Sequence, residues 1–163
     1  MDIQKALDKI PGPVGILGAI DGDNHRIITV SWFTQVSKNP PQLLVCVSPQ
    51  SSVHPIINKS KEFVLTILSK DMEEVARICG HTSENVSDKL DTAKLTTKTS
   101  KKVKVASINE GIFNLECQVT GEFTGGDHTI FVGEVLYVDE IKEEKPLIFY
   151  NRDLVTVDYS LSK

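Results

Sequence analysis

Hydroxyl side chains gather at two places in the chain, one at the end of the apolar segment 26–33 and one just after the apolar segment 43–47. Hydroxyl and backbone N–H donors from two neighbouring strand ends can surround one anion, such as a phosphate monoester, with few lysines. The same residue types commonly cap turns and helices, which is the alternative role for them. The first group is Thr29, Ser31, Thr34 and Ser37, and the second is Ser48, Ser51 and Ser52.

A glycine turn is the second candidate feature. Residues 125–129 read Gly-Gly-Asp-His-Thr, so the turn delivers His128 to the start of a long apolar segment. Glycines permit both a tight turn and the close approach of a flat ligand. An ordinary hairpin turn with an exposed histidine is the alternative.

Motifs for several other chemistries are missing from the sequence. It contains no GxSxG, Walker A, HExxH or strand-following GxGxxG pattern. The histidines and cysteines are widely spaced, which predicts neither a metal site nor a disulfide framework and favours reduced thiols. These residues are His25, His54, His81 and His128, and Cys46, Cys79 and Cys117.

Composition limits the class of protein further. A chain of 163 residues with 40% apolar and 25% charged residues predicts a single globular domain, residues 1–163. The net charge of −4 gives no electrostatic reason to bind nucleic acid or an anionic membrane. The N-terminus lacks a signal pattern, and no apolar run approaches the ~20 residues that span a bilayer. We therefore expect a cytoplasmic protein.

The first half of the chain predicts alternating strands and short helices. A short helix at residues 2–9 precedes a hairpin formed by segments 14–20 and 26–33. The stretch 37–41, with two prolines, is expected to break regular structure before a strand at 43–47. A helix from about 55 to 59 would direct its positive N-terminal end at the second hydroxyl group.

The middle of the chain predicts one strand and one amphipathic helix. The strand covers residues 62–68, and Asp71 and Glu74 have capping-box spacing ahead of apolar residues at helical intervals. Residues 81–104 form a long polar excursion, with one helical turn expected near 86–90.

The last third of the chain predicts antiparallel strands. Phe113, Leu115, Cys117, Val119 and Phe123 alternate with polar residues, so one strand face is expected in the core and Asn114, Glu116, Gln118, Thr120 and Glu122 in water. A turn at 125–126 leads to a strand at 129–138, and a further strand covers 146–150. The fold prediction is a mainly β (α+β) domain: an antiparallel, six-stranded, split β-barrel with helical insertions.

The order and spacing of these segments resemble the flavin reductase-like family of FMN-binding split barrels. The resemblance covers most of the chain, from about Val14 to Tyr150. Three blocks carry it, none specific by itself: TVSWFTQVS, NPP and the strand at 43–47; SSVH, NKS and the strand at 63–68; and GDHTIFVGEV with PLIFY.

The resemblance implies a homodimer that binds FMN in a groove at its interface. It places the isoalloxazine ring along Thr29, Val30, Ser31 and Trp32, and His128 on the side where the nicotinamide or substrate binds. It places the ribityl and phosphate groups against Ser48, Gln50, Ser51 and Ser52, with His54 nearby. The Lys89 cation is expected close to the phosphate. Ser37, from the first group of hydroxyl residues, is also expected to bind the cofactor.

The sequence departs from the family pattern at three positions. Val53 stands where many relatives have Thr in the phosphate loop, Leu90 where many have Phe, and Leu154 where many have Tyr. We therefore expect differences in the phosphate contacts and at the mouth of the site near the C-terminus.

The resemblance implies an FMN-dependent oxidoreductase that moves electrons between NAD(P)H and flavin, or a flavin-linked acceptor, by hydride transfer to flavin N5. This chemistry needs no side-chain nucleophile, and without a Rossmann motif the nicotinamide nucleotide would bind transiently. One alternative is a flavoredoxin-like electron carrier served by a redox partner protein. The other is a non-enzymatic barrel that binds flavin or another small ligand.

Overall fold

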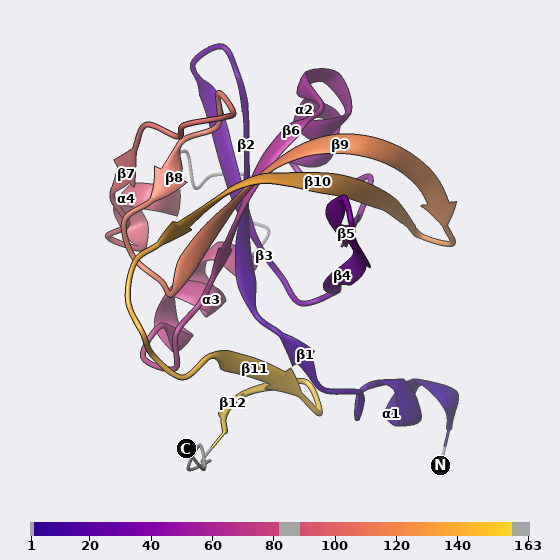
Figure 1. Ribbon diagram of the computed structural model, residues 1–163. Coiled ribbons are helices and arrows are strands. Elements are labelled where there is room, and N and C mark those ends of the chain that lie inside the picture. Colours follow the sequence, from indigo (N-terminus) through magenta and orange to yellow (C-terminus); the bar gives the residue numbers. More distant parts are fainter. Residues whose placement is uncertain (1, 82–88, 158–163) are drawn as a thin grey trace.

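A seven-stranded antiparallel sheet forms the body of the molecule (Figure 1). The computed structural model describes residues 2–81 and 89–157. The strand order within this part is β3-β2-β6-β9-β10-β5-β4. The strands are β2 (Gly15–Asp21), β3 (Asn24–Val30), β4 (Phe33–Lys38), β5 (Pro41–Val47), β6 (Glu62–Ile67), β9 (Phe113–Gly125) and β10 (His128–Glu140).

The two outer strands of this sheet are consecutive in the chain. Strand β3 ends at Val30 and β4 begins at Phe33, although they lie at opposite ends of the hydrogen-bonded order. Only Ser31 and Trp32 join them, so the sheet must curl until its two edges approach each other. The result is an antiparallel barrel that is open along one seam. This confirms the predicted split barrel, with seven strands in the sheet rather than six.

The interior of the barrel is filled by apolar side chains from every part of the sheet. Leu17 on β2, Val45 on β5, Phe63 and Leu65 on β6 and Phe131 on β10 are fully buried. Burying a side chain of this size stabilises a fold by about 1.5–3 kcal/mol. The predicted hairpin is confirmed by β2 and β3, which pair from Gly15↔Val30 to Asp21↔Asn24. Its second strand was predicted to continue to Phe33 but ends at Val30, because Phe33 begins the separate strand β4 and pairs with β5.

The stretch 37–41 is more regular than predicted. Ser37 and Lys38 belong to β4, Pro41 opens β5, and only the cis Asn39–Pro40 pair forms the turn. Pro41 is accommodated because it pairs with Lys38 of the outer strand β4, beyond the last residue of β5 that pairs with β10. A proline at the start of a strand removes no ladder hydrogen bond from the centre of the sheet.

Four short helices among the described residues lie outside the barrel: α1 (Ile3–Leu7), α2 (His54–Ser60), α3 (Glu73–Gly80) and α4 (Lys89–Thr92). Helix α2 confirms the helix predicted near Pro55, and α3 buries Ala76 and Cys79 as its amphipathic pattern predicts. The helical turn predicted near 86–90 falls mostly outside the described residues. No helix in the described part of the chain is long and apolar enough to cross a membrane.

The capping box predicted for α3 is wrong. Met72, not Asp71, is the N-cap residue, and no side chain caps the helix. The Asp71 carboxylate instead accepts a hydrogen bond from the Ser69 hydroxyl and forms an ion pair with Lys142. These two contacts hold the pKa of Asp71 below its usual value.

Two small sheets flank the barrel. Strands β1 (Gly12–Pro13), β11 (Leu147–Tyr150) and β12 (Asp153–Thr156) form one, and β7 (Thr97–Lys98) and β8 (Ser107–Ile108) form the other. The strand predicted at 146–150 is confirmed by β11. The short strands β1, β7, β8 and β12 were not predicted. Asn151 and Arg152 both have positive φ, as a two-residue turn between antiparallel strands requires.

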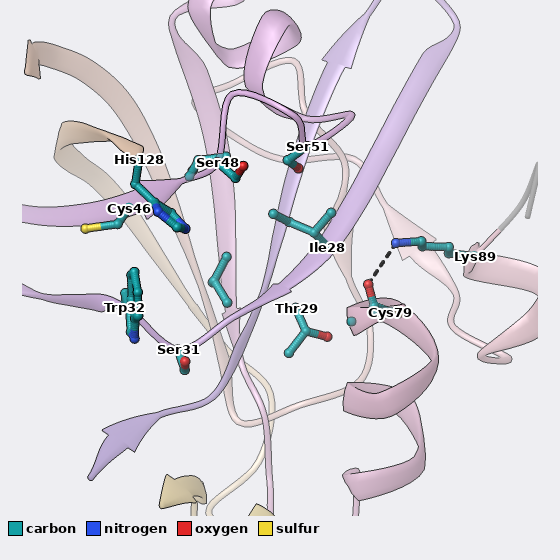
Figure 2. A pocket seen from close by; sticks show the side chains of 13 residues that line it. Ile28, Thr29, Ser31, Trp32, Cys46, Ser48, Ser51, Cys79, Lys89 and His128 are labelled. Atoms are coloured by element: carbon teal, nitrogen blue, oxygen red, sulfur yellow. Dashed lines mark hydrogen bonds between the residues drawn. The ribbon is translucent and has the colours of Figure 1, made fainter. Parts of the chain in front are cut away.

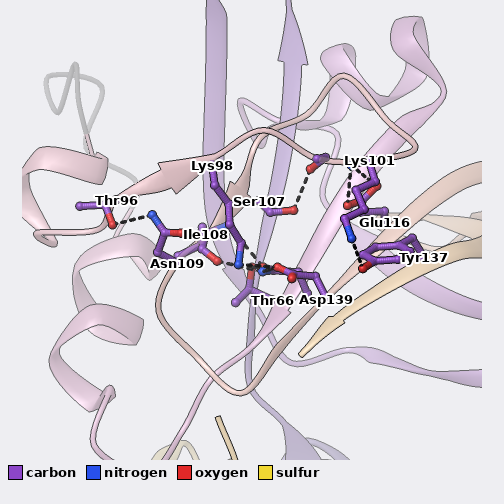
Figure 3. A network of polar contacts seen from close by, with 12 residues as sticks. Thr66, Thr96, Lys98, Lys101, Ser107, Ile108, Asn109, Glu116, Tyr137 and Asp139 are labelled. Atoms are coloured by element: carbon purple, nitrogen blue, oxygen red, sulfur yellow. Dashed lines mark hydrogen bonds and ion pairs between the residues drawn. The ribbon is translucent and has the colours of Figure 1, made fainter. Parts of the chain in front are cut away.

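The predicted alternation along β9 is wrong at three residues. Asn114 and Glu116 were expected in water but are buried, and Phe123 was expected in the core but is 59% exposed. The segment 93–110 covers the face of β9 that carries Asn114 and Glu116 (Figure 3). Asn114 accepts a hydrogen bond from the Thr66 hydroxyl at 2.6 Å and donates to the Ile108 carbonyl at 2.8 Å. The Glu116 carboxylate accepts backbone N–H groups of Lys101 and Lys102.

This network predicts a strong effect of Asn114→Ala on stability. The substitution leaves the buried Thr66 hydroxyl and Ile108 carbonyl without partners, which lowers the free energy of unfolding by about 2–3 kcal/mol. Asn109→Ala is the matched control, because Asn109 is exposed and its loss should cost less than about 0.5 kcal/mol. Urea denaturation measures both, and equal midpoints for the two variants would contradict the buried network.

Candidate functional site

A cavity of about 270 Å³ lies at the seam between β3 and β4 (Figure 2). Its walls come from the end of β3, the β3–β4 junction, the end of β5 with the loop that follows, the C-terminal end of α3, and single residues from α4 and β10. Among the described residues its lining is Ile28, Thr29, Val30, Ser31, Trp32, Cys46, Val47, Ser48, Ser51, Cys79, Gly80, Lys89 and His128.

The Thr29 hydroxyl is engaged within the protein. It donates a hydrogen bond of 2.7 Å to the carbonyl oxygen of Ala76 in α3. This bond ties the C-terminal half of α3 to the wall of the barrel, beside the cavity. Thr29 therefore shapes the cavity through its backbone and methyl group, while its hydroxyl proton is already used.

The loop after β5 forms a compact turn at one end of the cavity. The Ser51 N–H donates to the Ser48 carbonyl at 2.9 Å, and the His54 N–H donates to the Ser51 carbonyl at 3.1 Å. The Ser51 hydroxyl oxygen is buried and has no hydrogen-bond partner in the described structure. Buried polar groups nearly always have partners, so an orphaned hydroxyl in the wall of a cavity points to a polar ligand there.

Lys89 brings a positive charge to the same end. Its Nζ donates to the Cys79 carbonyl at 2.8 Å, so the cation sits at the C-terminal end of α3, where the helix dipole favours it. Burial lowers the pKa of Lys89. An anion next to Nζ would offset that cost of burial, because opposite charges favour the ionised form.

Trp32 and His128 form the outer wall of the cavity. Their ring centroids are 4.7 Å apart and their planes are tilted by 49°. Nδ1 of His128 lies 2.7 Å from a carboxylate oxygen of Asp127, and this contact lowers the pKa of Asp127. Trp32 is 58% exposed, so this wall is an aromatic surface that faces solvent on one side.

The two cysteines in the lining are neutral thiols. Burial raises the pKa of Cys46, and it raises the pKa of Cys79 to about 11. A thiol is a nucleophile only as the thiolate, so neither residue is activated for covalent chemistry. No group of three or more His, Cys, Asp or Glu side chains suited to a metal ion occurs in the ranges 2–81 and 89–157.

The structure brings together most of the site residues predicted from the sequence. Four of them do not line the cavity: Ser37 pairs with Gln42 farther along β4, Gln50 and Ser52 point outward as exposed residues, and the His54 ring binds Thr129. Those that line it are Thr29, Val30, Ser31, Trp32, Ser48, Ser51, Lys89 and His128.

The sequence-based prediction missed the apolar part of the wall. Ile28, Val47, Cys79 and Gly80 line the cavity, but none has a side chain that indicates ligand binding by its type. Cys79 and Gly80 lie at the end of α3, far from β3 in sequence. The helical spacing of apolar residues predicted that one face of α3 is buried. It did not indicate which element of the fold that face packs against.

A second cavity of about 310 Å³ adjoins the first and shares Thr29, Val30, Ser31 and Gly80 with it. Its remaining walls come from α3 and the β11–β12 hairpin, including Leu154, one of the positions that depart from the family pattern. Arg77 spans its rim, with ion pairs of 2.8 Å to both Glu73 and Asp153. The two cavities therefore form one groove along β3.

Comparison with known proteins agrees with this geometry. The model of the flavin reductase like domain family matches residues 7–158. The chain is 28% identical over 139 residues to an NADH-dependent FAD reductase of Streptomyces globisporus, covering 84% of this chain and 75% of that protein. It is 26% identical over 141 residues to an FMN reductase (NADH) of Rhizobium rhizogenes, covering 86% and 74%. The solved structure of an NADH:FAD oxidoreductase from Streptomyces globisporus superposes with a TM-score of 0.86 at 25% identity, covering 96% and 92%.

Proposed function

Because the chain belongs to the flavin reductase like domain family, we propose that it is an NAD(P)H-dependent reductase that binds FMN in the seam of the barrel. The observation that carries the proposal is the buried, unpartnered Ser51 hydroxyl at the end of the cavity that also holds Lys89. A phosphate group accepts hydrogen bonds from hydroxyls and from an ammonium group, and the cavity lining offers both in Ser48, Ser51 and Lys89.

The described residues fit FMN along the whole groove. Ser48, Ser51 and Lys89 would hold the phosphate. The backbone from Thr29 to Trp32 would border the ring, with apolar contact from Ile28 and Val47. The phosphate contacts would rest on one lysine and two hydroxyls, because Val53 is buried in the core and outside the cavity lining.

The protein supplies placement rather than reactive groups. Bound FMN supplies the hydride acceptor, N5 of its ring, for a reduced nicotinamide stacked against it. Trp32 and His128 provide a tilted aromatic wall on the open side, where a planar nicotinamide can stack. Asp127 fixes the His128 ring through Nδ1, and the lining thiols stay protonated. Orientation of two rings in contact is the main contribution that this site makes to the rate.

We propose FMN rather than FAD as the bound flavin. FAD carries a second phosphate and an adenosine, which would extend beyond the turn that follows β5 or along the groove. The arginines at the second cavity are engaged: Arg77 pairs with Glu73 and Asp153, and Arg152 lies 4.0 Å from Asp8. A second phosphate placed there would compete with the carboxylates of Glu73, Asp153 and Asp8 for the two arginines.

Stopped-flow reduction by NADH and by NADPH tests the proposed activity. Because both rings are held in place, FMN on the protein should be reduced about 10²-fold or more faster than free FMN at the same concentration. A rate equal to that of free FMN would remove the reductase proposal. Tight FMN binding with such a slow rate would favour the electron-carrier alternative. If the protein leaves FMN fluorescence unquenched, it binds no FMN, and both the reductase and the electron-carrier functions are contradicted.

Ser51→Ala tests the phosphate end of the site. Loss of this hydroxyl should weaken FMN binding by about 1–3 kcal/mol, because a hydrogen bond to a charged phosphate is lost. Riboflavin has no phosphate, so its affinity should change little. Ser52→Ala is the matched control, since Ser52 is exposed and outside the cavity lining. Fluorescence-quenching titrations give all four affinities, and equal losses for FMN and riboflavin would contradict the assignment.

We also propose that the protein is a homodimer that covers the open side of the site. Phe123, Ile130 and Cys46 lie directly opposite one another across β9, β10 and β5, so their side chains project from one face. Their neighbours Val45 and Phe131 project into the core, which makes this the outer face of the barrel. An apolar outer face that adjoins the cavity indicates a surface buried against a second copy.

Ile130→Lys should disrupt this interface, because a charged side chain would be buried at the centre of the apolar row. Sedimentation velocity should give twice the chain mass of 18.0 kDa for the native protein and the single-chain mass for this variant. Ile130→Val keeps the apolar surface and should remain dimeric. A native protein that sediments as one chain in the presence of FMN would refute the dimer.

A further inference from the structure

His54 lies beside the site but outside the cavity lining. Its Nε2 is 2.8 Å from the hydroxyl oxygen of Thr129, the second residue of β10. The ring also packs at a tilt against the buried Phe131, with centroids 5.4 Å apart. The imidazole is therefore part of the barrel wall, where it bonds to protein rather than facing the ligand.

The backbone of His54 belongs to the turn at the phosphate end. Its N–H donates to the Ser51 carbonyl at 3.1 Å, one turn before the start of α2. Thr129 directly follows His128, and it pairs with Val47, which lines the cavity. One residue thus contacts the turn that carries Ser51 through its backbone and the strand start that carries His128 through its side chain.

We propose that His54 is a positioning residue that links the phosphate-binding turn to the strand start bearing His128, whose ring packs against Trp32. The inference rests on the proposed function for its effect on FMN reduction. The link fixes the distance between the anion-binding end and the aromatic wall, so FMN and nicotinamide are held in one mutual arrangement. Phe131 limits rotation of the imidazole, which keeps Nε2 directed at Thr129.

Two substitutions remove the link from either side. His54→Phe keeps an aromatic ring against Phe131 but has no Nε2, and Thr129→Val removes the hydroxyl from a side chain of the same shape. Each should lower kcat for NADH-dependent FMN reduction about three- to tenfold while KM for NADH changes little. The double variant should be no worse than either single variant, because both remove the same bond.

His54→Gln provides the rescue. Its side-chain amide can reach Thr129 with a nitrogen in place of Nε2, so kcat should recover toward the native value. A purely structural role would instead make all three single variants less stable, without a selective change in kcat. Additive losses in the double variant, or no recovery with glutamine, would overturn the proposal.

Trp32 gives a readout that does not need flavin. It is the only tryptophan of the chain and it stacks on His128, so its fluorescence reports on the aromatic wall. In the flavin-free protein, Trp32 emission and its quenching by acrylamide should change in His54→Phe and Thr129→Val but not in His54→Gln. Unchanged emission in the first two variants would refute the link. A native protein that binds no FMN would refute the proposed function instead, and the tryptophan test would still decide the link.

Discussion

The two-residue connection between β3 and β4 is the constraint on which the rest of the structure depends. It joins the opposite edges of one antiparallel sheet, so the sheet has to roll up, and Ser31 and Trp32 span the place where the edges fail to pair. Within residues 2–81 and 89–157, β3 and β4 form no ladder with each other, although the Trp32 carbonyl accepts the Cys46 N–H. A seam of this kind leaves a groove with backbone polar groups in its wall. The closure that builds the barrel core therefore also builds the candidate site.

The candidate site presents few charged groups. One lysine, two serine hydroxyls and a compact turn face the end of the cavity, and the lysine is placed by a helix carbonyl rather than by an acidic side chain. A carboxylate partner would compete with a bound phosphate, whereas a neutral carbonyl competes far less. At the other end, Trp32 and His128 are packed against each other but remain open to solvent. A polar end for the tail of a ligand and an aromatic end that faces solvent suit the proposed cofactor and its transient second substrate.

The sequence by itself determined the fold class, and most of the residues that the sequence and the family resemblance predicted for the site line the cavity. Period-two patterns, glycine turns and proline positions are local signals, and they placed the β2–β3 hairpin, β5, β6 and the β9–β10 hairpin correctly. The hydroxyl clusters could be found in the same way, because the polar residues at strand ends stand out against apolar strands. Thr29, Ser48 and Ser51 were identified by residue type and position alone.

Only the tertiary structure decided what each of those residues contacts. Asn114 and Glu116 alternate as surface residues should, yet a distant polar segment covers them and satisfies their hydrogen bonds. The Thr29 hydroxyl binds α3, and the His54 ring turns to Thr129. These contacts join residues 6 to 75 positions apart in sequence. Local patterns determine which face of an element is polar or apolar, whereas the partner of that face depends on how the whole chain packs.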